Sequence, residues 1–565
     1  MNLGSQEAAR FEMTRVDEAL ARELARRGIT HAFVLMTSDT AKLVVELMRA
    51  GLRVYTTRHE AAAIGMADGF ARVSGTTGLA VVGRGPGLTN AMTALVASAR
   101  ARSRVVTLVG DGTIGQAQAA AREAKHLNQS RMLEGAFIPN VTLTSADSAI
   151  SDLDVVLESA SLGSTIVVNL PVDVLELASG RSDPQVSLAA QPEVPLCDEA
   201  MVSSVADLLE TSWAARRPVI LGGRGAVLAN AREELIRLGD LTGSLLGTTL
   251  LAKALFRGHP FDLGIIGSFS KPAALELLHQ ADVVLAFGAS LGKFTTYGGD
   301  VFPKARLVHV DRDATAFGRF ARPDLTVLGD ARDCAQAIRL ELERRGHRAA
   351  GYRTLSTSER LKEAPAHDDD LVVRSESMGL DPRRVVGALD RILPTERAVV
   401  VDPGHHLTFS CELSVPDPAS FILAIDSGAI GVAMGIAMGA AIARPDRPTV
   451  LCVGDGALMM SLGDLETIAR YRLPVLTVVM NDSGFGAEIH MLRFLGLPDA
   501  PAHYPSPGFG EIAVGLGMPS TTVRSLEDLD ALERMGRPAN LPLLIDCRIT
   551  QDVRGEWIPF HYGRN

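Results

Sequence analysis

The sequence predicts an α/β protein of three domains, each a doubly wound parallel sheet with helices on both faces. Its 565 residues are too many for one compact domain. Its 53 glycines and its low aromatic content of 5% are typical of domains in which strands and helices alternate through tight turns. Apolar runs alternate with helix-like stretches along the chain, which indicates strands buried on both faces of a sheet.

Three blocks of this kind follow one another. The first, residues 11–180, has predicted strands at 31–36, 53–58, 78–83, 104–110 and 164–171. The second, residues 198–345, has predicted strands at 218–223, 281–290, 305–313 and 325–331. The third, residues 381–550, has predicted strands at 398–401, 450–454, 474–480 and 541–549. Polar, linker-like stretches at 181–200 and 346–380 separate the blocks.

Composition argues against several functional classes. Acidic residues exceed basic ones by 66 to 56, and no basic tract suggests nucleic acid as a partner. The cysteines lack metal-ligand spacing and are expected to be reduced and mostly buried: Cys197, Cys334, Cys411, Cys452 and Cys547. The N-terminus lacks the apolar core of a signal peptide, and no apolar run approaches the length needed to cross a membrane. We therefore expect a cytoplasmic protein without a membrane partner.

Two aspartates follow neighbouring strands of the third block. Asp455 lies between Gly454 and Gly456 at the end of one predicted strand, and Asp482 follows Asn481 at the end of the next. A helix is expected over residues 457–473 between them. Carboxyl ends of parallel strands share one edge of a sheet, so the two carboxylates should lie together beside a helix start. This arrangement suits a Mg²⁺ ion bridging to phosphate oxygens. Either aspartate alone would be interpreted first as an ordinary turn or helix-cap residue, and only the two together favour a metal site.

Other nucleotide-binding motifs fit poorly. The stretches GDGALM, GRGPGL and GGRGAV each lack the third glycine of GxGxxG, and no GxxxxGK[ST] occurs. The GDG stretch followed by the Asn481-Asp482 pair instead resembles the thiamine diphosphate (ThDP) motif. Together with RHEAAAIGMADGFARVSG at 58–75 and GRGPGLTNAMTAL at 83–95, it makes the chain similar to the acetolactate synthase and pyruvate decarboxylase superfamily. Acetolactate-synthase-like chains are the most similar group within it.

This resemblance implies a pyrimidine-binding domain at 11–180, a central domain at 198–345 and a diphosphate-binding domain at 381–550. It implies that Asp455, Asp482 and the carbonyl of Gly484 bind Mg²⁺, with Asp482 replacing the usual asparagine. It also implies a homodimer or homotetramer whose active sites lie at the subunit interface.

The same resemblance assigns the coenzyme contacts. Glu60 is expected to hydrogen-bond the aminopyrimidine ring and to act in catalysis, and Ile430 to prop the bent coenzyme. Glu60 could otherwise be an ordinary cap or salt-bridge partner, and Ile430 a core residue. The Gly404-His405-His406 loop is expected to lie against the diphosphate, with His405 in place of the usual glutamine. The full set of expected contacts is Glu60, Gly404, His405, His406, Gly428, Ile430, Gly454, Asp455, Gly456, Ala457, Asp482, Gly484 and Phe485.

Glu488 is a second catalytic candidate, because it matches the position of an active-site glutamate in pyruvate decarboxylases. It could otherwise be an exposed acid favoured at a helix start. His490 is a weaker candidate. The chain departs from the family at residues 34–40, where a glycine-rich loop is usual, at Arg84, where a small residue is usual, and at Asp111, where a glutamine is usual. The identity of the substrate therefore does not carry over.

The expected reaction is decarboxylation of a 2-oxo acid, with carboligation of the acyl-anion equivalent to a second carbonyl. One alternative is a non-oxidative decarboxylase that releases an aldehyde, which Glu488 would favour. Another is a flavin-dependent oxidoreductase, since some acetolactate synthases bind FAD in the central domain, although no motif here supports FAD. A third is a relative that binds the coenzyme without catalysis, against which the presence of Glu60, Asp455 and Asp482 argues.

Overall fold

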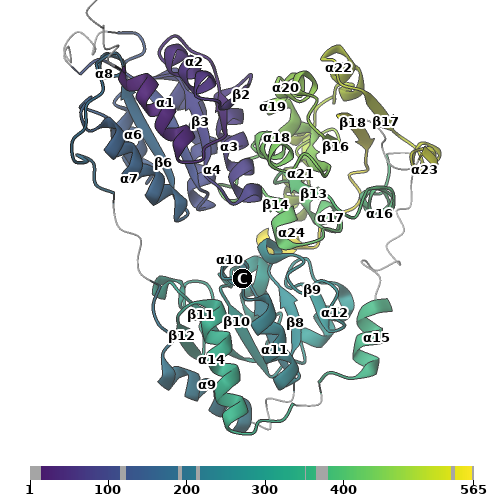
Figure 1. The fold of residues 1–565 in the computed structure, drawn as a ribbon. Helices are drawn as coiled ribbons and strands as arrows, with labels where there is room; N and C mark the ends of the chain where they lie inside the picture. The colour runs from purple at the N-terminus through teal and green to yellow at the C-terminus, as the bar shows by residue number, and fades with distance from the viewer. Residues whose placement is uncertain are drawn as a thin grey trace, which may run out of the picture.

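Three six-stranded sheets, in which every strand pair is parallel, confirm the predicted α/β class (Figure 1). The computed structural model describes residues 14–114, 123–188, 194–211, 217–349, 352–363, 379–535 and 541–562. Residues 11–13 of the first predicted domain, residues 189–193 of the first predicted linker, and residues 350–351 and 364–378 of the second lie outside this range.

The first sheet has the strand order β2-β1-β3-β4-β6-β5. Its strands are β1 (His31–Val34), β2 (Arg53–Thr56), β3 (Gly78–Val82), β4 (Val105–Asp111), β5 (Asn140–Thr142) and β6 (Thr165–Pro171). The helices are α1 (Val16–Arg26), α2 (Ala41–Arg49), α3 (Glu60–Ser74), α4 (Pro86–Arg100), α6 (Gln129–Gly135), α7 (Ala149–Ser161) and α8 (Val172–Leu175). The runs 78–82 and 165–171 are buried at every position, as expected of strands covered on both faces.

The central sheet has the order β12-β11-β10-β7-β8-β9. Its strands are β7 (Pro218–Gly222), β8 (Leu245–Thr248), β9 (Asp262–Ile265), β10 (Val283–Phe287), β11 (Arg306–Asp311) and β12 (Leu325–Leu328). Its helices are α9 (Glu199–Thr211), α10 (Arg224–Leu228), α11 (Arg232–Thr242), α12 (Pro272–Leu278), α13 (Lys293–Thr296) and α14 (Ala331–Arg344). The predicted second linker contains a further helix, α15 (Leu355–Glu363), preceded by Tyr352, whose hydroxyl donates to the Leu277 carbonyl at 2.6 Å.

The third sheet has the order β14-β13-β15-β16-β18-β17. Its strands are β13 (Ala398–Val401), β14 (Phe421–Leu423), β15 (Thr449–Gly454), β16 (Val475–Asn481), β17 (Ser520–Val523) and β18 (Leu543–Arg548). Its helices are α16 (Pro382–Ile392), α17 (Leu407–Ser410), α18 (Ala433–Ala443), α19 (Asp455–Ser461), α20 (Asp464–Tyr471), α21 (Gly486–Phe494), α22 (Phe509–Gly515), α23 (Leu526–Met535) and α24 (Trp557–Tyr562). The helix expected over 457–473 is thus two helices, and the break falls at Gly463, a residue type that weakens helix interiors.

The first and third domains of one chain share a single apolar core along α3 and α18. Helix α18 is apolar on all sides and buried from Ala433 to Ala441, which is typical of a helix inside a core. Glycines let the two backbones approach closely. A Cβ built on Gly69 would lie 2.0 Å from the Ile436 carbonyl oxygen, and one on Gly439 would lie 2.0 Å from that of Met66. No side chain fits at this crossing unless the helices move apart.

We predict that Gly69→Ala destabilises the protein by about 2 kcal/mol or more, because the added methyl group overpacks a backbone contact. The measurement is the midpoint of thermal unfolding. Gly387→Ala in α16 is the matched control, since a Cβ there meets only the end of the Arg391 side chain, at 3.6 Å. That control should be neutral or stabilising by up to about 1 kcal/mol. Equal effects of the two substitutions would contradict the close packing of α3 and α18.

Four of the five cysteines are buried and all are free thiols, as expected. Among the helices that the structure describes, none combines the length and apolar character needed to cross a membrane.

Candidate active site

Asp455 and Asp482 lie at one edge of the third sheet. β15 and β16 pair in parallel with Gly454 opposite Met480, so both aspartates leave the sheet at its carboxyl edge. Both side chains are buried. Burial raises the pKa of Asp455 to about 6, and burial plus the nearby charge of Asp455 raises the pKa of Asp482 to about 8. Two buried carboxylates this close favour a cation between them.

The residues at this edge fit a magnesium ion. The Oδ2 atom of Asp455 is buried and has no hydrogen-bond partner among the described residues. The backbone N–H of Gly484 interacts with both carboxylates, which places the third expected ligand residue beside them. No group of three or more His, Cys, Asp or Glu side chains suited to a metal occurs in the described ranges. Two carboxylates and a carbonyl form an all-oxygen donor set, which a hard cation such as Mg²⁺ prefers.

The loop after β16 has a strained and tightly paired backbone. Ser483 adopts a positive φ of 59°, which is uncommon for a residue other than glycine. Gly484 forms a bridge with His503, and a Cβ on Gly484 would lie 2.8 Å from the Ala502 carbonyl oxygen. The side chain of Asn481 is engaged elsewhere, because its amide donates to Asp546 Oδ1 at 2.9 Å. The chain thereby directs only Asp482 of the Asn-Asp pair toward Asp455.

Tyr504 is a site residue that the sequence did not reveal. Its side chain lies beside Asp455 and lowers the pKa of that carboxyl against the effect of burial, while its own buried hydroxyl has no hydrogen-bond partner among the described residues. A Cβ on Gly456 would lie 2.7 Å from the Tyr504 hydroxyl and 2.8 Å from the Phe485 ring, so only glycine fits there. Ala457 is buried in the first turn of α19, whereas Phe485 is partly exposed. Tyr504 comes from an irregular segment that carries no recognisable spacing signal.

The histidines of the 404–406 loop are buried and uncharged. Burial lowers the pKa of His405 well below its usual value and that of His406 to about 4. The Gly555 N–H donates to His405 Nε2 at 2.9 Å, which fixes that nitrogen as an acceptor. The His406 ring lies over Gly404 and Gly454, at 3.2 and 3.4 Å from their Cβ positions, and its Nε2 has no partner in the part of the chain that the structure describes. This loop therefore lies against the GDG turn.

His490 packs on His405, with ring centroids 4.1 Å apart. Burial lowers the pKa of His490 to about 4, and its Nε2 is buried without a partner among the described residues. His490 also lines a cavity of about 1620 Å³ between the central and third domains. Glu488, two residues earlier on α21, is exposed, and its charge contributes to raising the pKa of both Tyr504 and Tyr562.

A loop at residues 424–433, here called the coenzyme loop, carries Gly428 and Ile430. Gly428 has a φ of +72°, and Ile430 packs against the core shared by α3 and α18. Asp402, at the end of β13, accepts hydrogen bonds from the N–H groups of Gly431 at 2.9 Å and Ala433 at 3.0 Å. Burial raises the pKa of Asp402 to about 7, against the effect of these donors. Asp402 thus fixes the end of the coenzyme loop at the start of α18, a role that the sequence reading missed.

Glu60 is the first residue of α3 and is buried. The strand predicted over 53–58 ends at Thr56, and His59 caps the following helix by accepting from the Ala61 N–H at 3.1 Å. The Oε2 atom of Glu60 accepts from the Asn90 side chain at 3.1 Å. Glu60 therefore lies at a helix N-terminus, where the backbone dipole favours a carboxylate.

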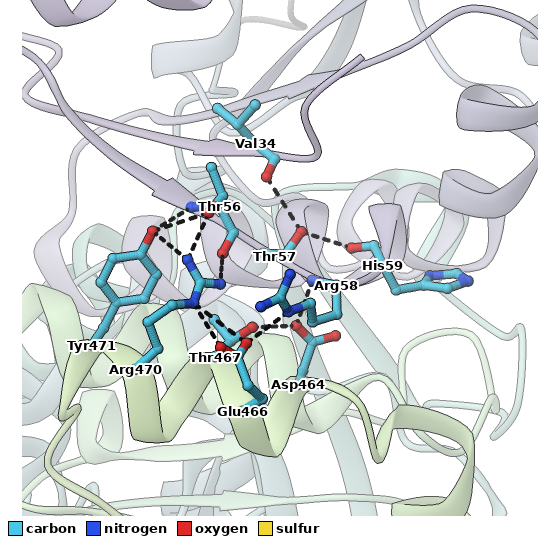
Figure 2. Close-up of polar contacts among 10 residues, drawn as sticks. All are labelled: Val34, Thr56, Thr57, Arg58, His59, Asp464, Glu466, Thr467, Arg470 and Tyr471. Atoms are coloured by element: carbon cyan, nitrogen blue, oxygen red, sulfur yellow. Dashed lines mark hydrogen bonds and ion pairs between the residues drawn. The ribbon is translucent and has the colours of Figure 1, made fainter. Parts of the chain in front are cut away.

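Side chains of α20 hold the segment that precedes Glu60 (Figure 2). Tyr471 accepts from the Thr56 N–H at 2.8 Å, and Arg470 donates to the Thr56 carbonyl at 2.6 Å. Asp464 accepts from the Arg58 N–H at 3.0 Å, and the Arg58 side chain pairs with Glu466 at 2.7 Å. These groups bind the backbone of edge strand β2 as a neighbouring strand would. These contacts from the third domain thus fix the position of the N-terminus of α3, where Glu60 lies.

We predict that Asp464→Ala destabilises the protein by about 1–3 kcal/mol, because the Arg58 N–H and the Thr467 hydroxyl both lose their acceptor at a buried position. Denaturant unfolding measures this difference. Glu466→Ala is the matched control on the same helix: its partners Arg58 and Arg470 are both partly exposed, so the loss should stay below about 1 kcal/mol. A smaller effect at position 464 than at 466 would contradict the role assigned to Asp464.

The three departures from the family meet at the carboxyl edge of the first sheet. Arg84 pairs with Asp39 of the 34–40 loop at 3.4 Å and with Glu123 at 2.8 Å. Asp39 also lies against Gly110, at 2.9 Å from its Cβ position. Burial raises the pKa of Asp111, which lies near the charge of Arg84. The changed residues thus form one charged cluster on the side of the first domain where Glu60 and α4 begin.

Three segments of the chain, in order, match the models of three protein-family domains. Residues 14–132 match "Thiamine pyrophosphate enzyme, N-terminal TPP binding domain", residues 202–338 match its central domain, and residues 402–547 match its C-terminal TPP binding domain.

Among similar proteins, a sulfoacetaldehyde acetyltransferase of Alcaligenes xylosoxydans xylosoxydans is 29% identical over 91% of this chain and 88% of its own length. A probable acetolactate synthase large subunit of Methanocaldococcus jannaschii is 26% identical over 94% of this chain and 91% of its own. An acetolactate synthase of Mycobacterium leprae is 26% identical over 89% and 82%, respectively.

Proposed function

The chain belongs to the thiamine pyrophosphate enzyme family, and from this premise we propose that it decarboxylates a 2-oxo acid and joins the acyl unit to a second carbonyl compound, using ThDP and Mg²⁺. It is a ThDP-dependent enzyme of the transferase or lyase type. The carboligation and the use of Mg²⁺ are our proposals. The observation that best supports them is the pair of buried carboxylates, Asp455 and Asp482, at one edge of the third sheet.

In this proposal Asp455, Asp482 and the Gly484 carbonyl hold Mg²⁺. The diphosphate lies among Gly404, His405, His406, Gly454, Gly456, Ala457 and Phe485, and the rings lie against Gly428 and Ile430. When bound, the coenzyme supplies a nucleophilic carbon for the keto group and accepts the electron pair left as carbon dioxide departs. We propose that Glu60 exchanges a proton with the pyrimidine ring nitrogen from its fixed place at the start of α3.

The chain's own residues prepare the site in further ways. We propose that His405 and His406 contact the diphosphate. Their lowered pKa values keep both imidazole rings neutral, so they do not compete with Mg²⁺ for the negative charge of the diphosphate. Asp402 holds the coenzyme loop against α18. As the family resemblance implies, we propose a homodimer or homotetramer in which the first domain of one subunit and the third domain of another complete each site.

The test is product analysis with purified protein, ThDP and Mg²⁺. Pyruvate and longer 2-oxo acids are supplied with and without a second carbonyl compound, and carbon dioxide and products are measured by mass spectrometry. We expect ThDP-dependent carbon dioxide release and a carbon–carbon coupled product. Because a similar protein is named sulfoacetaldehyde acetyltransferase, sulfoacetaldehyde belongs in the same panel. Absence of any ThDP-dependent conversion would contradict the proposal.

A second candidate is release of an aldehyde after decarboxylation. Glu488 in the first turn of α21, close enough to Tyr504 for its charge to act on that side chain, favours it, because an acid there can deliver a proton to the product. Aldehyde as the dominant product, reduced in Glu488→Gln, would support this candidate over carboligation.

A further inference from the structure

We propose that Arg72 of the first domain and Arg224 of the central domain are positioning residues for the coenzyme loop, and that both act through the carboxylate of Asp426. The proposal rests on the function proposed above for Ile430 in that loop. It adds that the first and central domains control the position of this loop.

Each carboxylate oxygen of Asp426 contacts the guanidinium group of a different arginine. Arg72 Nη2 donates to Asp426 Oδ2 at 3.1 Å, and Arg224 Nη1 lies 3.5 Å from Asp426 Oδ1. Asp426 leaves the sheet just after β14, Arg72 lies on α3, and Arg224 begins α10. The Asp426 side chain is only 9% exposed, so these contacts are shielded from water and salt. All three domains therefore meet on one buried carboxylate.

Both arginines are themselves fixed to the first domain. Arg72 makes two parallel hydrogen bonds to Asp68, at 2.7 and 2.9 Å, a geometry that sets the plane of the guanidinium. Ser103 donates to the same Asp68 carboxylate. Arg224 donates through Nη2 to the Ala101 carbonyl. Asp426 thus binds to cations whose positions are already determined.

Asp426 lies in the turn that opens the coenzyme loop. The Gly428 N–H donates to the Ile425 carbonyl at 2.8 Å, which closes a turn around Asp426 and Ser427. Ile430 follows two residues later, and Asp402 fixes the far end of the loop at Gly431 and Ala433. Ile430 is therefore held between two anchored ends. Release of the Asp426 end would change the position of Ile430 more than the stability of the fold.

A purely structural ion pair is the competing explanation. Arg224 is one-third exposed, so its pair with Asp426 should contribute little to global stability. A positioning role instead predicts a local effect on the coenzyme loop. Arg102 gives a matched control, because it also joins the first and central domains, 3.8 Å from Asp313, but it is exposed and its ion pair is with Asp313 rather than with Asp426.

The test is backbone amide hydrogen exchange of residues 424–433, measured by mass spectrometry on the full-length apo protein. Arg224→Ala should speed exchange there about fivefold or more, while Arg102→Ala should leave it unchanged. Asp426→Asn, which keeps the shape of the side chain, should give an intermediate increase. With ThDP bound, Arg224→Ala should lower kcat more than it raises KM for ThDP.

Exchange at 424–433 that is unchanged in Arg224→Ala, or that rises equally in Arg102→Ala, would overturn the inference. This measurement requires no turnover. A protein that converts no 2-oxo acid but shows the faster exchange would refute the proposed function and leave the positioning role intact. The reverse result would refute only the positioning role.

Discussion

Replacement of Glu60 by glutamine should lower kcat about 100- to 1,000-fold while the coenzyme still binds, because the amide keeps the shape of the side chain but cannot exchange a proton. Glu60 is buried at the start of α3, and Asn90 already occupies one of its oxygens. The other oxygen is the one available to a pyrimidine nitrogen. The measurement is the rate of 2-oxo acid consumption at saturating ThDP, with ThDP affinity determined by calorimetry.

Glu199→Gln is the control for this substitution. It makes the same chemical change in the first turn of α9, at an exposed position of the central domain. It should leave kcat unchanged. Wild-type turnover in Glu60→Gln, or equal losses in both variants, would remove Glu60 from the catalytic machinery.

Replacement of Asp455 by alanine should weaken binding of Mg²⁺ and ThDP by about 100-fold or more. Loss of a direct ligand should exceed the roughly 10- to 100-fold effect of groups that only support a ligand. The apo protein should not lose stability, because Asp455 is a buried carboxylate with a raised pKa and lies near the like charge of Asp482. Its thermal midpoint should stay equal or rise.

Asp482→Asn is the matched variant at the neighbouring position. It restores the residue type usual in the family, keeps an oxygen donor and removes one negative charge, so ThDP should still bind with an affinity within about tenfold of wild type. Calorimetric titration with Mg²⁺ and ThDP measures both variants. Tight binding retained by Asp455→Ala would refute the metal site proposed at this edge of the sheet.

The fold class could be predicted because several inner strands, such as β3, β7, β10 and β16, are buried at every position and read as continuous apolar runs. β15 and β16 are bounded by turn residues and were recognised directly from sequence. Five strands were not, namely β5, β8, β9, β14 and β17, because three or four residues are too few to show a pattern. The break between α19 and α20 was also missed, since the apolar spacing continues across Gly463 while the backbone does not.

The placement of Asp455 and Asp482 at one edge followed from strand ends alone, because adjacent parallel strands carry their next residues to the same side. Tyr504 and Asp402 could not be found in this way. Tyr504 reaches the site from an irregular segment, and Asp402 acts on N–H groups some thirty positions further along the chain. Such contacts depend on tertiary packing, which no local spacing encodes.

The glycine crossing of α3 and α18 limits how this protein can be recombined with its relatives. Each helix supplies the hollow into which the backbone of the other fits. A chimera that takes its first domain from one parent and its third from another would join two surfaces that were never selected as a pair. Functional hybrids should therefore inherit both helices from the same parent.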